Sequence, residues 1–110
     1  MIDETKIEYE EGSGNVFADL GLEDADELLT RAKLGYSVRQ IVKKRGLKQR
    51  EIAKILDLKQ PEVSNLMQGK YHLFSEGRLF SFLNKLDQKI IVQVIRRKKN
   101  DPLQEVVFTP

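Results

Sequence analysis

The amino-acid sequence predicts a small, mainly α-helical protein that ends in one short β-strand. Residues 47–69 read as two short amphipathic helices around a three-residue break. Residues 23–45 read as a longer helix, with acidic residues in the first turn and basic residues in the last, which complements the helix dipole. Residues 90–95 form a short run of mostly β-branched side chains, which is typical of a strand.

The N-terminal part of the chain holds a tail and a single helical turn. Residues 1–14 contain few apolar side chains, and we expect a flexible tail there with a short extended piece at Ile7–Tyr9. Asn15 is placed to cap a helical turn that Gly21 closes, and this turn carries three apolar side chains, Val16, Phe17 and Leu20. These side chains either pack on the domain or enter a groove of a partner.

The helix predicted for residues 23–45 turns one face toward a core. The apolar positions of that face are Leu28, Ala32, Gly35, Val38, Ile41 and Val42. Gly35 lies in the middle, where it either splits the stretch into two helices or lets another helix approach closely. Gly46 then ends the helix.

Residues 47–69 carry the most specific pattern in the chain. The two helices, Gln49–Leu56 and Gln60–Gln68, each have an apolar face, made of Ile52, Ala53 and Leu56 in the first and of Val63, Leu66 and Met67 in the second. Three residues separate the helices, and Gly69 ends the second one. Helices joined so closely must cross steeply, and the small Ala53 allows the approach. This is the plan of a helix-turn-helix motif, whose second helix lies in the major groove of DNA.

A further helix is predicted after a short loop. Ser75 is a favourable N-cap, and Phe74 before it and Leu79 after it fit a hydrophobic staple. The helix runs to about Leu86, with its core face at Leu79, Phe82, Leu83 and Leu86. His72 in the loop is the only histidine of the chain. A single histidine in a chain without cysteine lacks partner ligands of the His and Cys type, and we expect no bound metal and no cofactor.

The strand predicted at residues 90–95 needs a partner for its backbone groups. Val106–Phe108 is one candidate, reached through a turn at Asn100–Pro102. The same strand of a second protomer is the other. Both faces of the strand are apolar, which is unfavourable for an exposed edge, and we favour antiparallel pairing across a two-fold axis. The expected dimer interface is Ile90, Ile91, Val92, Val94 and Ile95. The basic run at residues 96–99 then either contacts the DNA backbone or is a solvated strand end.

Length and charge suggest one small domain with two tails. The 110 residues divide into an acidic N-terminal segment (1–22), a helix-turn-helix domain (23–88, motif 48–68) and a C-terminal strand with a basic tail (89–110). Residues 1–30 have a net charge of −9, and residues 31–110 have a net charge of +11, which favours a polyanionic partner. No signal peptide and no membrane-spanning run is recognised, and we expect a cytoplasmic, nucleoid-associated protein. The sequence shows no nucleophile–base pair, no metal cluster and no cofactor loop, so we do not expect an enzyme.

The motif resembles the helix-turn-helix of the lambda-repressor-like regulators, the XRE family. That pattern has an Ala in the first helix, a Gly that opens the turn, and often a Gln at the start of the second helix. Here these places hold Ala53, Asp57 and Gln60. Asp57 departs from the pattern, because the turn needs a residue at positive φ, which Gly adopts freely and Asp tolerates.

The order of motifs along the chain is similar to that of the HigA-type antitoxins. The resemblance covers roughly residues 12–96 and includes GSGNVFADLGL, KKRGL, QPEVSNL and FSEGRL. It implies a dimeric repressor that binds a palindromic operator in its own promoter and also binds a small basic toxin that cleaves mRNA. A stand-alone or phage-derived regulator with no toxin partner is the alternative.

The second helix of the motif predicts the DNA contacts. Gln60 is placed to pair with adenine, Glu62 to accept from cytosine, and Ser64 and Asn65 are further base-contacting candidates. Phosphate contacts are expected from Lys48, Gln49, Lys59, Lys70 and Tyr71, with Gln49 assigned by the resemblance. A dimer would place two second helices one DNA turn apart, roughly 34–36 Å.

Overall fold

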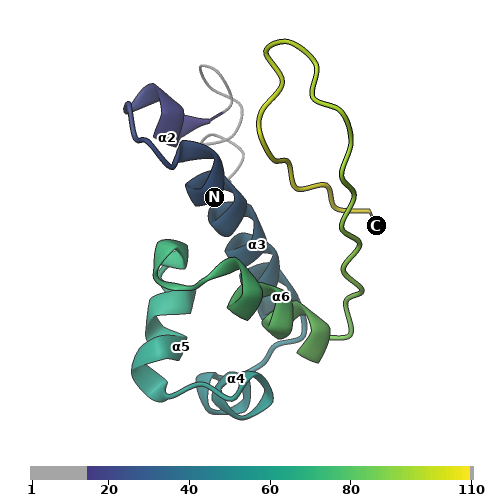
Figure 1. Ribbon diagram of the computed structural model, residues 1–110. Coiled ribbons are helices and arrows are strands. Elements are labelled where there is room, and N and C mark those ends of the chain that lie inside the picture. The colour runs from purple at the N-terminus through teal and green to yellow at the C-terminus, as the bar shows by residue number, and fades with distance from the viewer. Residues whose placement is uncertain (1–14, 110) are drawn as a thin grey trace. The chain divides into compact units, whose positions relative to one another are not determined.

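The computed structural model describes residues 15–109 and is helical, as the sequence predicts (Figure 1). Its α-helices are α2 (Val16–Asp19), α3 (Ala25–Lys44), α4 (Gln49–Leu56), α5 (Gln60–Met67) and α6 (Glu76–Lys85), and a 3-10 helix, η1, covers Tyr71–Leu73. The extended piece predicted at Ile7–Tyr9 lies outside the described residues. The chain divides into two compact units, of which one is residues 31–93 and the other is made of the flanks, up to Thr30 and from Val94.

The unit of residues 31–93 holds the helix-turn-helix around an apolar core. The side chains with the least exposure in this core are Val38, Val42, Ile52, Leu56, Val63, Leu66, Phe74, Leu79 and Leu86. α4 packs against both α5 and α6. Phe74 and Phe82 meet edge to face, with ring centroids 5.6 Å apart. Phe74 and Leu79, the two residues of the predicted staple, are both buried, at 2% and 0% exposure.

α3 is continuous through Gly35, which therefore serves a close approach and does not split the helix. A Cβ atom at Gly35 would lie 2.2 Å from Cδ1 and 2.4 Å from Cγ of Tyr71. The ring of Tyr71 thus occupies the space that a side chain at this position would fill. Leu34, the preceding residue, is also buried at 4% exposure, although it lies outside the inward face that the sequence pattern predicts.

In the other unit, Asn15 caps α2 as predicted. Its Oδ1 accepts from the backbone N–H groups of Phe17 at 3.0 Å and Ala18 at 3.1 Å. Gly21 has a φ of 76°, the left-handed conformation of a helix-closing glycine. The Asn15 side-chain amide also donates to Oδ1 of Asp26 at 3.2 Å, which links the cap of α2 to the first turn of α3.

The C-terminal segment differs from the prediction, because no strand occurs between residues 15 and 109. Residues 90–95 find no ladder partner among the described residues, and Val106–Phe108 does not pair with them. The predicted turn does form: Asp101 N–H donates to Lys98 O at 3.1 Å, and Asn100 has a φ of 70°. The strand prediction was wrong for the part of the chain that the structure describes, because a strand needs a hydrogen-bonded neighbour and residues 15–109 supply none.

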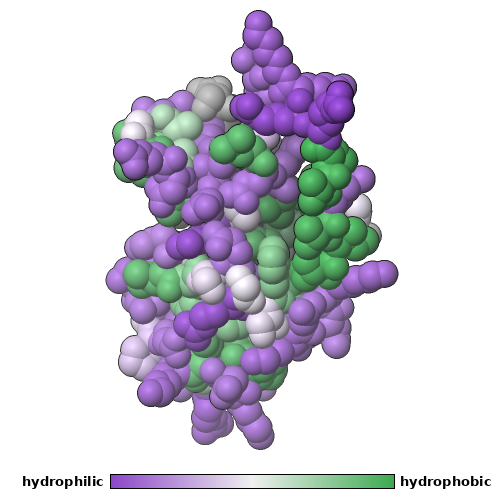
Figure 2. Space-filling view, viewed as in Figure 1, coloured by the Kyte–Doolittle hydropathy of each residue, from purple (hydrophilic) through white to green (hydrophobic). Residues whose placement is uncertain are grey.

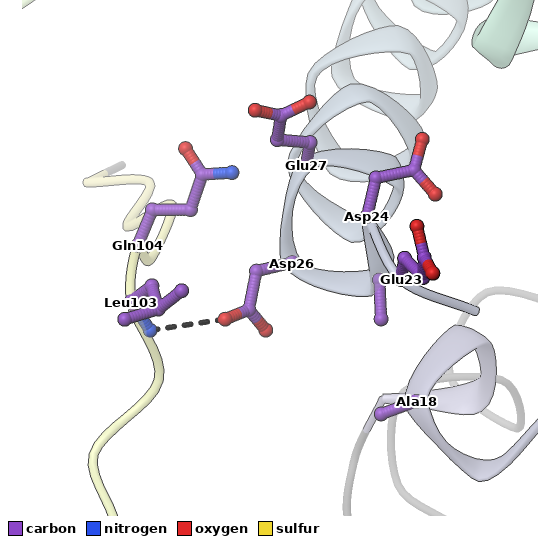
Figure 3. A pocket seen from close by; sticks show the side chains of 8 residues that line it. Ala18, Glu23, Asp24, Asp26, Glu27, Leu103 and Gln104 are labelled. Carbon is purple, nitrogen blue, oxygen red and sulfur yellow. Dashed lines mark hydrogen bonds between the residues drawn. The ribbon is translucent and has the colours of Figure 1, made fainter. Parts of the chain in front are cut away.

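The segment after α6 is therefore unusually exposed for its composition. Val94 is 92% exposed and Ile91 is 78% exposed. Apolar side chains gather on the surface along this segment (Figure 2). Farther on, the Leu103 N–H donates to Oδ2 of Asp26 at 3.1 Å, beside an acidic hollow lined by Glu23, Asp24 and Glu27 (Figure 3).

Candidate nucleic-acid interface

The two helices of the motif begin with the same short sequence. Residues 47–52 and 58–63 both read Leu-Lys-Gln-x-Glu followed by Ile or Val. Lys48 and Lys59 precede the helices with identical backbone angles, φ −81° and ψ 158°. Gln49 and Gln60 are consequently the first residues of α4 and α5. The repeat places a lysine and a glutamine, both exposed, at each helix start.

A glutamate in each repeat supplies part of the missing cap. Lysine has no acceptor for the free N–H groups of a first helical turn. Oε1 of Glu51 accepts from the backbone N–H of Lys48 at 2.9 Å, and Oε1 of Glu62 accepts from that of Lys59 at 3.2 Å. This is the glutamate half of a capping box. The ammonium groups are not used in the caps and remain available to phosphate.

The turn between the helices has the conformation that the family pattern demands. Asp57 has φ 55° and ψ 51°, which is left-handed, so the aspartate adopts the conformation that glycine usually supplies. Leu58 follows it, is buried at 7% exposure, and donates its N–H to Ala53 O at 2.9 Å. The turn therefore closes on the small residue predicted at the helix crossing.

The outer face of α5 presents three of the four predicted base-contacting residues. Gln60 is exposed, and its side chain makes no hydrogen bond to any described residue. Ser64 and Asn65 are half-buried, and Oγ of Ser64 accepts from the Gln68 side-chain amide at 3.0 Å. The inward positions, Val63 and Leu66, are both 0% exposed. α5 is thus anchored by its apolar face and offers polar groups on the other.

Glu62, the fourth predicted base contact, is engaged within the protein. Its Oε1 accepts from Lys59 N–H, and its Oε2 pairs with Nη1 of Arg78 at 2.9 Å. The Lys59 N–H, and after it the Arg78 guanidinium, hold the pKa of Glu62 below its ordinary value. Both oxygens have protein partners, which gives Glu62 a structural task at the start of α5.

The predicted phosphate contacts fall into two groups. Lys48, Gln49, Lys59 and Lys70 are exposed and stand at the beginnings of α4 and α5 or just after α5. Tyr71 is only 9% exposed, with its ring against Gly35. Because the Tyr71 ring packs in the core, it orients the loop after α5. Among the five predicted phosphate contacts, that from Tyr71 is therefore the least supported.

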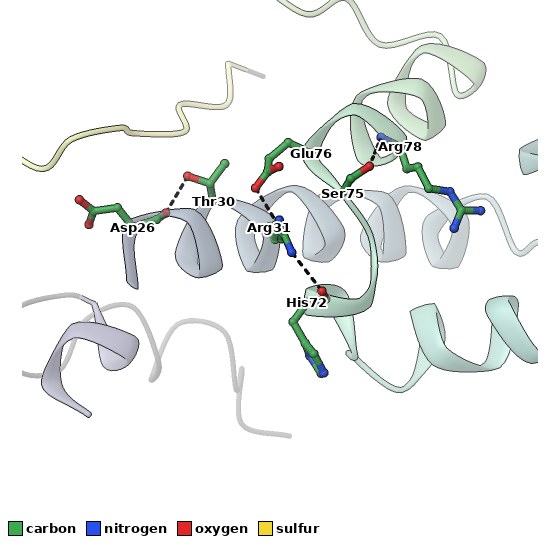
Figure 4. Close-up of polar contacts among 7 residues, drawn as sticks. All are labelled: Asp26, Thr30, Arg31, His72, Ser75, Glu76 and Arg78. Carbon is green, nitrogen blue, oxygen red and sulfur yellow. Dashed lines mark hydrogen bonds and ion pairs between the residues drawn. The ribbon is translucent and has the colours of Figure 1, made fainter. Parts of the chain in front are cut away.

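A second ion pair holds that loop. Nε of Arg31 in α3 donates to Oε1 of Glu76 at 2.7 Å, and Nη1 donates to His72 O at 3.2 Å (Figure 4). The hydrogen bond from Arg31 lowers the pKa of Glu76. One arginine therefore connects α3 with both ends of the segment between η1 and α6. Sequence reasoning missed this pair, since its members are far apart in the chain and each looks like ordinary surface.

The described part of the chain offers little that suggests other chemistry. No group of three or more metal-ligating side chains occurs among residues 15–109. Over the same residues, no helix combines the length and the apolar character needed to cross a bilayer.

Lysine at the cap positions should trade stability for DNA affinity. Lys48→Thr and Lys59→Thr would each complete the capping box, and we expect each to raise the melting temperature, since a cap is worth about 1 kcal/mol. Each should weaken binding to all DNA and lower the slope of log K against log salt by about one. Melting curves and salt titrations measure both effects. Lys54→Thr, within α4, is the stability control and should bring no gain. An unchanged salt slope for both cap variants would mean that these lysines do not touch phosphate.

Comparison with known proteins agrees with this geometry. A family model described as a helix-turn-helix domain matches residues 16–95. A solved structure named as an XRE family transcriptional regulator is 29% identical, with a TM-score of 0.69, and the match covers 79% of this chain and 98% of that one. No curated protein matches the chain. The chain belongs to the helix-turn-helix domain family, as a DNA-binding regulator of the XRE type.

Proposed function

We propose that this regulator is a sequence-specific repressor that reads a palindromic operator on chromosomal DNA with α5. The observation that carries the proposal is the start of α5, where the unengaged side chain of Gln60 stands beside the exposed Lys59. The side-chain amide of glutamine can donate to N7 of adenine while its carbonyl oxygen accepts from the N6 amino group, a pairing that distinguishes adenine from the other bases. Ser64 and Asn65 continue the same polar face, and Lys48, Gln49 and Lys70 support it on the phosphates.

Gln60→Ala tests this proposal. The variant should lose about 1–3 kcal/mol on a duplex that the wild-type protein selects from a random DNA pool, and should relax specificity at one base pair. Gln49→Ala is the matched control, because Gln49 occupies the same place in the repeated sequence at α4. Its loss should be equal on the selected duplex and on a shuffled one. Equal losses from Gln60→Ala on both duplexes would remove the base-reading role.

The repressor is further proposed to act as a homodimer joined through residues 90–95. These residues expose apolar side chains on both faces, and residues 15–109 offer their backbone groups no strand to pair with. An antiparallel pair across a two-fold axis would satisfy both needs at once. It would also give the two copies of α5 the symmetry that a palindrome requires.

An antitoxin role is the finer form of the proposal, and a regulator without a toxin is the alternative. Support comes from the net charge of −9 on residues 1–30 and from exposed apolar residues beside α2, with Leu20 at 71% and Leu22 at 44% exposure. Acidic and apolar groups together suit a small basic protein. Residues 1–14 of this segment lie outside the described part of the chain.

Deletion of residues 1–22 should separate the two roles. The shortened protein should bind DNA as well as the full chain or better, since it loses mainly negative charge. It should capture the basic protein encoded beside its gene more weakly in a pull-down or by calorimetry. Full affinity of the shortened protein for that partner would move the toxin site to the domain. A neighbouring product that the full chain does not bind would favour the stand-alone regulator.

A further inference from the structure

Arg78 in α6 is held in an unusual way for a surface arginine. Its guanidinium carbon lies 5.4 Å from the ring centroid of Phe74 and 5.6 Å from that of Phe82. Both rings are buried, at 2% and 3% exposure, while the Arg78 side chain is 43% exposed. A planar guanidinium against two aromatic rings has few orientations available. The two buried rings therefore restrict the orientation of the Arg78 guanidinium.

The Arg78 guanidinium contacts the first turn of α5. Nη1 of Arg78 meets Oε2 of Glu62 at 2.9 Å, and Oε1 of the same carboxylate accepts from the Lys59 N–H. The backbone N–H of Arg78 in turn donates to Oγ of Ser75, the cap of α6 (Figure 4). One carboxylate thus ties the first turn of α5 to the first turn of α6.

The repeated sequence supplies an internal comparison. Glu51 stands at the start of α4 as Glu62 stands at the start of α5, and it closes the cap of Lys48 in the same way. Among the residues that the structure describes, however, Glu51 makes no ion pair. The cap alone is therefore common to both helices, and the added arginine distinguishes the helix that is proposed to read bases.

We propose that Arg78 is a positioning residue for sequence readout, which acts through Glu62 to fix the first turn of α5 and with it Gln60. This inference rests on the proposed function of α5. Discrimination between bases requires paired hydrogen bonds in a narrow geometry, whereas attraction to phosphate depends chiefly on charge. A loosened first turn should therefore reduce selectivity more than general affinity for DNA.

Two variants of opposite charge test the proposal. Arg78→Ala removes a positive charge, and Glu62→Gln removes a negative one. Lys59 and Arg78 contact different oxygens of Glu62, and glutamine replaces one of these oxygens by an NH2 donor, so the variant cannot keep both contacts in this geometry. If only charge mattered, Arg78→Ala would weaken binding to a shuffled duplex and Glu62→Gln would strengthen it. Loss of positioning predicts that both variants lower the ratio of affinities for selected and shuffled DNA, by roughly tenfold.

The matched control is Glu51→Gln, which changes the same residue of the repeat where no arginine is attached. It should leave the ratio within about twofold of the wild-type value, since its amide oxygen still accepts from Lys48. The double variant Arg78→Ala/Glu62→Gln should lose no more selectivity than either single one, because both break the same link. All ratios are measured at a temperature at which every variant is folded.

Amide hydrogen exchange gives a readout that needs no DNA. The N–H groups of Glu62 and Val63 both donate to Lys59 O, at 3.0 and 3.1 Å, within the first turn of α5. They should exchange faster in Arg78→Ala and Glu62→Gln, while Ile52 in α4 keeps its wild-type rate.

The outcomes separate this inference from the function on which it rests. Unchanged exchange in α5, an unchanged affinity ratio, or an equal loss from Glu51→Gln would each overturn the positioning role and leave the repressor proposal standing. If the wild-type protein selects no sequence from the random pool, the proposed function fails, and the readout role of Arg78 fails with it.

Discussion

Gly35→Ala should lower the free energy of unfolding by about 1–3 kcal/mol, as overpacked cores do. The added methyl group would lie 2.2, 2.4 and 2.8 Å from Cδ1, Cγ and Cβ of Tyr71. These atoms belong to the rigid base of a buried side chain, so neither partner can move without disturbing α3 or η1. The loss should appear although alanine is favoured over glycine in a helix by about 1 kcal/mol. Urea denaturation followed by circular dichroism measures it.

Gly77→Ala is the matched control in α6. A Cβ atom at Gly77 meets nothing within 4 Å, so only the helix preference acts there and stability should rise slightly. Gly35→Ala combined with Tyr71→Ala should cost less than the sum of the two single changes, because the second removes the clash. Additive losses, or a stable Gly35→Ala protein, would show that the packing against Tyr71 adapts without strain.

The helix-turn-helix could be predicted from sequence because its signals are local. The bounds of α4 were predicted correctly, and those of α5 within one residue, from apolar spacing and from Gly69. The caps at Asn15 and Ser75 were also predicted, since each acts on N–H groups two or three residues away. The positive φ of Asp57 was expected from the resemblance to the family, in which a glycine usually opens this turn.

What sequence reasoning missed depends on contacts between distant residues. Leu34 lies four residues before Val38 and shares one buried stripe of α3 with it and with Val42, whereas Leu28, Ala32 and Ile41 of the predicted face are only half-buried. Glu62 looked like a base contact on α5, and only the fold brings Arg78 of α6 to its second oxygen. A usable signal for Arg78 existed: an arginine between Phe74 and Phe82, within one turn of a helix cap. This spacing indicates that the arginine guanidinium packs against the two aromatic rings.

The strand prediction shows where composition is ambiguous. β-branched residues at 90–95 favour an extended backbone, but a ladder also needs a second strand, and composition does not say which chain supplies it. Within the described part of the chain the segment has no ladder partner, and most of its side chains are exposed. A strand that pairs within residues 15–109 is therefore ruled out, and pairing between two chains stays a proposal.

Proline in this segment should therefore have a larger effect on DNA binding than any other change considered for this protein. A proline in the middle of a ladder removes a hydrogen-bond donor and is poorly tolerated. Alternate N–H groups of a strand point to opposite edges, so either Val92 or Gln93 donates to the second copy, whatever the register. At least one of Val92→Pro and Gln93→Pro should be monomeric. That variant should bind the selected duplex about 10²- to 10⁴-fold more weakly, because a monomer loses the gain in affinity that comes from linking two DNA-binding domains.

The domain itself should survive these changes. Val92 is 75% exposed and lies outside the core of residues 31–93, so the melting curve of a dilute sample should stay close to that of the wild-type monomer. Val92→Thr is the control, because it keeps both the N–H group and the β-branched shape and should remain dimeric. Sedimentation velocity at matched concentrations gives the oligomeric state, and gel shifts give the affinity. Dimers of wild-type stability in both proline variants would place the dimer interface elsewhere, and the exposed segment would then need a different partner.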